Sequence, residues 1–186
     1  GNEVVMTALD ERKLLGVFDP PAAKNYPKQF RDPDLRMTPW RVLPYGINYN
    51  NQLLKGDEAP KTFEELLLPK WKQRFALANP GIHVTTLQFM LSLEKLLGPQ
   101  WLKVVEGWAK QEPRLGKGLS DLIQPLTTGE VPVAISYIKD KFQYPGPIDY
   151  VRMNKYLASV SFVAINRQAP HPNAAKLFTD FFLGAE

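Results

Sequence analysis

The spacing of apolar residues predicts strands that alternate with helices through the middle of the chain. Residues 74–78 and 131–137 are short apolar runs of the kind found in buried strands, and residues 40–49 form an extended segment rich in aromatic and branched side chains. From 85 to 97 the apolar residues recur at helical spacing, and Gly98 is placed to end that helix. Strands and helices in this order are typical of an α/β fold.

Capping signals predict where other helices of this region begin and end. Thr62 and Glu65 have the spacing of a capping box that opens a short helix. Pro99 is suited to the first turn of a helix. A third helix is expected to begin at a capping Ser120 and to end at Gly129.

The two ends of the chain are also predicted to combine strands and helices. Residues 4–6 suit a short buried strand, followed by a helix that Thr7 would cap. Residues 19–39 are rich in proline and polar residues and predict a long surface loop. A strand is expected over 156–165, and Pro172 opens a C-terminal helix. The apolar face of that helix is expected to consist of Ala174, Leu177, Phe178, Phe181 and Phe182.

The composition narrows the chemistry that the chain can carry. It contains no cysteine, which excludes disulfides, thiolate metal sites and cysteine nucleophiles. The histidines are His83 and His171, without an H-x-x-x-H pattern, so we expect no zinc site, and we expect no cofactor. The net charge is +4, but lysine and arginine are scattered, which argues against nucleic acid as a partner and suits anionic small molecules. No apolar run approaches the length of a membrane span.

Four stretches of sequence occur together in a known group of transport proteins. In chain order they are PKTFEELL at 60–67 with PKWK and FALANP close behind it, GEVPVAI at 129–135, SFVAI at 161–165 and APHPNAAKLF at 169–178. In this order and at these separations they resemble the family 1 extracellular solute-binding proteins of bacterial ABC transporters, the group that includes ferric-iron receptors. The resemblance covers nearly the whole chain.

The resemblance implies a type II periplasmic-binding fold, in which two α/β lobes are joined by two crossover segments and a ligand binds in the cleft between them. Residues 45–156 would then form a complete second lobe with its crossover segments. Residues 1–44 and 157–186 would form an incomplete first lobe, whose opening strands are expected to be absent from this chain. The strands at 74–78 and 131–137 should lie beside each other in one sheet.

The function that the resemblance implies is that of a receptor rather than an enzyme. We expect it to capture a small anionic or oxygen-rich solute, a metal complex included, and to deliver it to an ABC permease in the membrane. The expected location is periplasmic or extracytoplasmic, with membrane anchoring left open because no export signal is recognisable. The alternatives are a ligand-sensing regulatory domain of the same fold and, more remotely, a hydrolase. Against a hydrolase, Gly118–Leu122 lacks the second glycine of a G-x-S-x-G motif.

Two loops that lead into the start of a helix are candidate ligand sites, and the first of them follows the strand over 74–78. Free backbone N–H groups at the start of a helix attract anions, and glycine allows a ligand to approach the backbone closely. The plainer alternatives are that Thr85 is a helix cap, and that the second loop is a surface turn with a serine cap. The candidate ligand residues are Asn79, His83, Thr85 and Thr86 at the first loop and Lys117 and Ser120 at the second.

Three tyrosines complete the candidate ligand site. Tyr137 ends the strand over 131–137, where the ferric receptors carry two adjacent tyrosines. Because the flanking residues here are Ser136 and Ile138, we expect no direct coordination of Fe(III), and Tyr137 would be a metal ligand only if a ferric solute is bound. The alternative is a half-buried tyrosine with a satisfied hydroxyl group. Tyr45 and Tyr49 are added because crossover residues of this fold face the cleft, although aromatic residues are also ordinary strand formers.

An incomplete first lobe would leave apolar surface and sheet edges uncovered. An open sheet edge and a large exposed apolar patch both favour association with another chain. We therefore predict self-association of this chain through strand pairing or segment exchange. The rival expectation is that the lobe closes over itself and uses the 19–39 loop as a lid.

Overall fold

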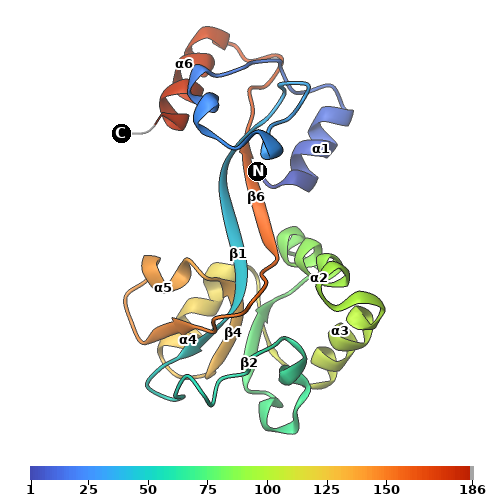
Figure 1. The fold of residues 1–186 in the computed structure, drawn as a ribbon, viewed down its shortest axis with the longest axis vertical. Coiled ribbons are helices and arrows are strands. Elements are labelled where there is room, and N and C mark those ends of the chain that lie inside the picture. Colours follow the sequence, from blue (N-terminus) through green and yellow to red (C-terminus); the bar gives the residue numbers. More distant parts are fainter. Residues whose placement is uncertain (185–186) are drawn as a thin grey trace. The chain divides into compact units, whose positions relative to one another are not determined.

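The computed structural model describes residues 1–184, and the chain divides into two compact units (Figure 1). Unit 1 comprises Gly1–Val42 together with the C-terminal part of the chain from Ser159. Unit 2 comprises Leu43–Ala158. Within residues 1–184, no helix has the length and apolar character needed to cross a membrane.

Unit 2 is built on a mixed sheet. The strand order is β3 (Arg114–Gly116), β2 (Phe75–Ala78), β4 (Val133–Tyr137), β1 (Thr38–Asn50) and β5 (Ile148–Tyr150). β2 is parallel to both β3 and β4, whereas β1 runs antiparallel to β4 and β5. The predicted pairing of the strands near 74–78 and 131–137 is therefore confirmed.

Helices cover both faces of this sheet, and its central strands are therefore buried on both sides. On one face Phe75, Leu77 and Ile135 pack with α2 (Val84–Leu97) and α3 (Trp101–Lys110). On the other face Ala76 and Ala134 pack with α4 (Ile123–Thr127). Successive strand residues thus serve opposite faces, as the pleat of a β-strand requires. The result is a three-layered α/β unit.

The helix predicted over 85–97 is present, whereas the helix predicted from Ser120 to Gly129 differs from the one observed. α2 ends at Gly98, whose φ of 63° is readily adopted by glycine. A 3₁₀ turn (Gly98–Gln100) then leads into α3. The helix expected from Ser120 to Gly129 is instead a 3₁₀ turn (Leu119–Leu122) followed by α4, and Ser120 lies inside that turn without capping it. The prediction of a serine cap is therefore wrong.

The predicted capping box at Thr62 is only half formed. Thr62 Oγ1 accepts a hydrogen bond from the Glu65 amide at 3.3 Å. The Glu65 carboxylate accepts from the Lys61 amide at 2.9 Å, which lies one residue earlier than a capping box requires. The segment forms two 3₁₀ turns, Glu64–Leu67 and Pro69–Trp71, rather than a regular helix. A four-residue helix, α5 (Asp140–Gln143), follows β4.

Unit 1 opens with a helix rather than the predicted strand. The side chain of Asn2 accepts a hydrogen bond from the Val5 amide at 3.0 Å and so caps α1 (Glu3–Glu11). Thr7 lies in the middle of this helix, and Met6 is its buried residue. A local cap thus outweighs the extended preference of a three-residue apolar run.

The remaining elements of unit 1 are short 3₁₀ turns, the first residues of β1, the strand β6 and one helix. The 19–39 segment contains two turns, Pro21–Asn25 and Lys28–Phe30, and its Arg36 pairs with both carboxylate oxygens of Asp10 at 2.9 and 3.0 Å. The strand β6 (Ala158–Val163) pairs with β1, and the helix α6 (Pro172–Leu183) closes the described chain.

Most of the apolar face predicted for α6 is exposed, although the ring of Phe182 lies 5.0 Å from that of Trp40 in unit 1. The helix buries Thr179 and Leu183, whereas the predicted apolar residues remain in contact with solvent. Both hydrophobic core clusters of the described residues belong to unit 2. Unit 1 accordingly has little core of its own. The exposed fractions are 73% for Leu177, 61% for Phe178, 71% for Phe181 and 40% for Phe182.

Gly46 provides a test of how tightly β1 and β4 are packed. It pairs with Ser136, and a Cβ atom at Gly46 would lie only 2.9 Å from Ile138 Cγ1. We expect Gly46→Ala to lower the free energy of unfolding by about 1–3 kcal/mol, as over-packing usually does. Urea unfolding measures the loss. In an Ile138→Ala background the same substitution should cost less, and an equal cost in both backgrounds would contradict the proposed clash.

Candidate functional site

Most of the predicted ligand residues lie at one edge of the sheet in unit 2. Because β2, β3 and β4 are parallel, their carboxyl ends meet at the same edge, which is where α/β folds bind ligands. β1 is antiparallel to β4, and its Tyr45 is paired with Tyr137 at this edge. We use the name edge site for Tyr45, Asn79, His83, Thr85, Thr86, Lys117, Ser120 and Tyr137.

The loop after β2 is organised by Asn79 and His83. Asn79 Oδ1 accepts a hydrogen bond from the Gly81 amide at 2.9 Å, and the backbone N–H of Asn79 donates to the Gly116 carbonyl at 2.8 Å. This second bond ties the loop after β2 to the end of β3. His83 is the N-cap of α2, since its Nδ1 accepts from the Thr86 amide at 3.3 Å. The alternative of a Thr85 cap is therefore wrong, because Thr85 lies inside the first turn of the helix.

The hydrogen bonds of His83 fix which of its nitrogens can meet a ligand. Because Nδ1 accepts from the amide of Thr86, and lies 2.8 Å from its hydroxyl oxygen, the proton of a neutral ring is on Nε2. A side chain at Gly118 would be 3.8 Å from this Nε2, in ordinary contact. The Nε2–H donor therefore lies beside the loop after β3. Thr86 is buried, and its hydroxyl is already engaged by His83.

Lys117 and Ser120 present polar side chains on the loop after β3. Both residues are exposed. The Lys117 amide donates to the Asp121 carboxylate at 2.9 Å, while within residues 1–184 the Lys117 ammonium group has no hydrogen-bond or ion-pair partner. Since Ser120 caps no helix, its hydroxyl is not committed to the backbone. The two groups are chemically suited to an anionic ligand.

Tyr45 belongs to the core of the edge, and Tyr137 to its surface. Tyr45 is 2% exposed, its ring stacks on Phe89 at 4.4 Å, and its hydroxyl donates to the Thr85 carbonyl at 3.0 Å. Burial, followed by the neighbouring Tyr137, raises the pKa of Tyr45 well above its ordinary value, so its phenol stays protonated. Tyr137 lies 4.6 Å from the Tyr45 ring and is partly exposed. Tyr137 is therefore the tyrosine that a ligand can reach.

Tyr49 is not brought to the edge site. It pairs with Val133, at the opposite end of β4 from Tyr137, which places it about 13 Å along the strand. Its pKa is raised by burial and by Asp149, and it lies near Arg152. The period of β1 places Tyr45 and Tyr49 on one face, but the four-residue spacing keeps them apart, and the register puts Tyr45 beside Tyr137.

Metal-binding groups are sparse in the described part of the chain. Residues 1–184 contain no cluster of three histidine, cysteine, aspartate or glutamate side chains that could hold a metal ion. Among the described residues of the edge site, Tyr137 is the one tyrosine whose phenol oxygen could reach a ferric ion, because the phenol of Tyr45 is buried and protonated.

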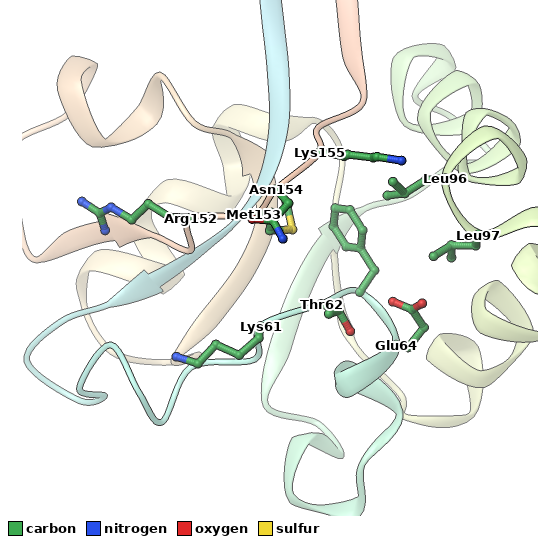
Figure 2. A pocket seen from close by; sticks show the side chains of 10 residues that line it. Lys61, Thr62, Glu64, Leu96, Leu97, Arg152, Met153, Asn154 and Lys155 are labelled. Carbon is green, nitrogen blue, oxygen red and sulfur yellow. The ribbon is translucent and has the colours of Figure 1, made fainter.

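A separate cavity of about 430 Å³ lies in unit 2 (Figure 2). The ring of Phe63 packs 5.5 Å from Phe89, which in turn stacks on Tyr45, so aromatic rings link the cavity to the edge site. Figure 2 shows Lys155 extending toward Leu96, whereas Lys61 and Arg152 point to the other side. Sequence reasoning missed this cavity because its walls come from three distant segments. Its lining residues are Lys61–Glu64, Leu96, Leu97 and Arg152–Lys155.

Comparison with solved structures defines the fold class as that of the type II periplasmic binding proteins. Iron-bound HitA from Pseudomonas aeruginosa superposes with a TM-score of 0.78 at 18% identity, over 97% of this chain and 61% of that one. AfuA from Actinobacillus pleuropneumoniae, with fructose-6-phosphate bound, superposes with a TM-score of 0.81 at 22% identity, over 99% of this chain and 61% of that one. A two-component system protein that mediates signal transduction superposes with a TM-score of 0.75 at 18% identity, over 96% of this chain and 60% of that one. At these identities the likeness concerns the fold alone.

The chain belongs to the family of bacterial extracellular solute-binding proteins, whose sequence profile matches residues 2–186. The family and these structural neighbours are binding proteins. No curated protein matches the chain by sequence. The chain spans about 61% of the length of HitA and of AfuA.

Proposed function

We propose that this chain recognises a small anionic or oxygen-rich solute as part of the receptor of an ABC importer. The observation that supports the proposal is that residues with hydrogen-bond donors lie on adjoining loops at the edge site. The Lys117 ammonium group, the Ser120 hydroxyl and the His83 Nε2–H come from two loops that the bond between Asn79 and Gly116 joins. Tyr137 adds a phenol at the end of the adjacent strand. Donors gathered in this way suit phosphate or carboxylate oxygens.

The same arrangement favours an anion over a bare ferric ion. Fe(III) requires several hard oxygen ligands, preferably ionised. The burial that raises the pKa of Tyr45 opposes formation of a second tyrosinate beside Tyr137. AfuA carries fructose-6-phosphate and HitA carries iron, and the chemistry of the edge site in this chain is closer to the first of these solutes. A sugar phosphate or a related oxyanion is the proposed class.

The wider role follows from the family. We infer delivery of the solute to a membrane permease, in the periplasm or elsewhere outside the cytoplasm, without catalysis. The second candidate is a ligand-sensing domain, which the likeness to the two-component system protein favours. Incubation with ester and phosphoester panels, with product detection, tests the absence of hydrolysis. Co-purification with a permease rather than with a kinase distinguishes the importer from the sensor.

The donor set predicts which substitution weakens binding. We expect a thermal-shift screen with inorganic phosphate and sugar phosphates to raise the melting midpoint, since a solute that binds only the folded protein stabilises it. Lys117→Ala should then weaken binding by roughly 10- to 150-fold, the equivalent of about 1.5–3 kcal/mol for a hydrogen bond to a charged group. Titration calorimetry measures the dissociation constant.

Lys110→Ala is the matched control, because Lys110 is an equally exposed lysine at the end of α3. It should leave the affinity unchanged. Equal losses in the two variants would indicate a general effect of charge, and tight ferric binding with a tyrosinate absorption band would contradict the proposed solute class.

A further inference from the structure

The cavity of about 430 Å³ in unit 2 is a second candidate ligand site, and its lining shares no residue with the edge site. Helix α2 begins at the edge site, where His83 caps it, and its last residues, Leu96 and Leu97, line the cavity. With a rise of about 1.5 Å per residue, Leu96 lies about 16 Å along the helix from Thr85. A ligand in the cavity therefore meets a different set of side chains from a ligand at the edge site.

The inner part of the cavity is apolar and well packed. Phe63 is 1% exposed, its carbonyl accepts a hydrogen bond from Trp108 Nε1 at 3.0 Å, and the centroids of the two rings are 6.0 Å apart. The other apolar residues of the lining are partly buried against the same core, and they are Leu96, Leu97 and Met153. This wall favours a ligand with an apolar group, because contact with the wall removes that group from water.

Two of the three cationic side chains around the cavity are already bound to the protein. The Lys61 ammonium group donates a hydrogen bond to the Gly56 carbonyl. Arg152 Nη1 donates to Asp149 Oδ1 at 3.0 Å and to the Tyr150 carbonyl at 2.8 Å. Because these two charges have partners within unit 2, neither group is assigned to a ligand.

Glu64 and Lys155 are the charged groups of the lining that remain without partners. Both residues are exposed, and within residues 1–184 neither side chain has a hydrogen-bond or ion-pair partner, so the two do not pair with each other. In Figure 2 they lie on opposite sides of Leu97. The cavity thus presents one negative and one positive charge beside an apolar wall.

This combination of charges selects among the classes of small ligand. A ligand with a single charge is attracted by one of the two groups and repelled by the other. A zwitterion pairs with both groups at once. An α-amino acid carries a carboxylate, an ammonium group and a side chain on one carbon atom, and an apolar side chain matches the wall. The cavity volume also lies within the usual range of small-molecule sites, about 300–1,000 Å³.

We propose that this cavity binds a free α-amino acid with an apolar side chain. Its carboxylate accepts hydrogen bonds from the Lys155 ammonium group, its ammonium group donates to the Glu64 carboxylate, and its side chain covers Phe63 and Leu97. The site is additional to the proposed function, which uses the edge site and an anionic solute. Either proposal can therefore fail without the other.

Binding is measured in the full chain through the NMR signals of the methionine methyl groups, with L-leucine as the probe. Met153 lines the cavity, whereas Met6 and Met37 belong to unit 1. We expect the Met153 signal to shift and saturate as leucine is added, while the other two stay in place. 4-Methylpentanoate, which lacks the ammonium group, and 3-methylbutylamine, which lacks the carboxylate, should each bind roughly fivefold more weakly, the upper contribution of an exposed ion pair. Equal binding of either analogue, or a Met153 signal that does not move, would overturn the proposal.

Exchange of the two charges gives a stricter test, because a zwitterion can bind in the reverse direction. Glu64→Lys and Lys155→Glu each leave two like charges, and each should weaken leucine binding roughly tenfold by losing one pair and adding a repulsion. The double variant restores one charge of each sign and should recover most of the affinity. Circular dichroism checks that these exposed substitutions leave the fold intact. Lys117→Ala at the edge site is the control and should leave leucine binding unchanged. A folded double variant that binds no better than the single variants, or a loss in the control, would contradict the assignment.

Discussion

The purified chain should scatter light with an apparent mass above 21.1 kDa at dilute concentration, and Phe178→Glu with Phe181→Glu should return it to that mass. The physical reason is the exposed apolar face of α6, where two phenylalanines are 61% and 71% exposed. With about 200 Å² for each phenylalanine, Phe178, Phe181 and the 40%-exposed Phe182 leave roughly 340 Å² of apolar surface in water, a patch of the size that often serves as an association surface. A second copy of the chain is the proposed occupant.

The matched control is Phe142→Glu in unit 2, because Phe142 is 74% exposed but lies outside this face. It should leave the mass unchanged. The rival expectation gave the 19–39 segment the role of a lid. That segment reaches α6 through Ala22, whose amide donates to Asp180 at 2.8 Å, and through Tyr26, whose hydroxyl donates to the Leu183 carbonyl at 3.3 Å. The phenylalanines remain exposed all the same. A monomer that binds no hydrophobic dye would contradict self-association.

Trp108→Ala should lower the free energy of unfolding of unit 2 by about 3–5 kcal/mol, the usual cost of removing a buried aromatic side chain. Trp108 is 1% exposed, its Nε1 donates to the Phe63 carbonyl at 3.0 Å, and its ring contacts that of Phe63. Because small domains are stable by only about 5–15 kcal/mol, the variant should be close to unfolding. Urea unfolding followed by circular dichroism measures the change.

Leu102→Ala is the control on the same helix. Leu102 is 49% exposed, so its truncation should cost less than about 0.5 kcal/mol. Trp108→Phe should lie between the two, since it keeps an aromatic ring but removes the hydrogen bond to Phe63. If Trp108→Ala proved no more costly than Leu102→Ala, the packing described for this side of the sheet would be wrong.

The sequence predicted the periodic elements well, and the reasons are local. The helix over 85–97 was visible because its apolar residues keep the helical period, and the strands at 74–78 and 131–137 were visible as short apolar runs. Residues 4–6 were mistaken for a strand because three apolar residues show no period, and the Asn2 cap was the signal that would have corrected them. The 3₁₀ turn at Ser120 was missed because a serine before an apolar run resembles a cap.

The sequence could predict only those residues of the candidate site that follow a recognisable strand end. The loop after the strand at 74–78 was placed at a ligand-binding edge because strand ends are where α/β folds bind ligands, whereas the second loop was added from the family resemblance, since β3 was not predicted. Which of Tyr45 and Tyr49 lies beside Tyr137 depends on the register between β1 and β4, which no local pattern reveals. The burial of Asn48 and Asp140 was also hidden, because polar residues in strands and turns are usually exposed.

The row of aromatic rings that runs from Tyr137 through Tyr45, Phe89 and Phe63 to Trp108 has an optical consequence. Each ring in the row has its centroid within 6.0 Å of the next. Excitation of a phenol can be transferred through space to an indole, so the Tyr137 phenol at the surface of the edge and the buried Trp108 indole form a donor and acceptor pair. The chain has seven tyrosines and four tryptophans, so this pair is read by comparing the fluorescence of the natural chain with that of Tyr137→Phe.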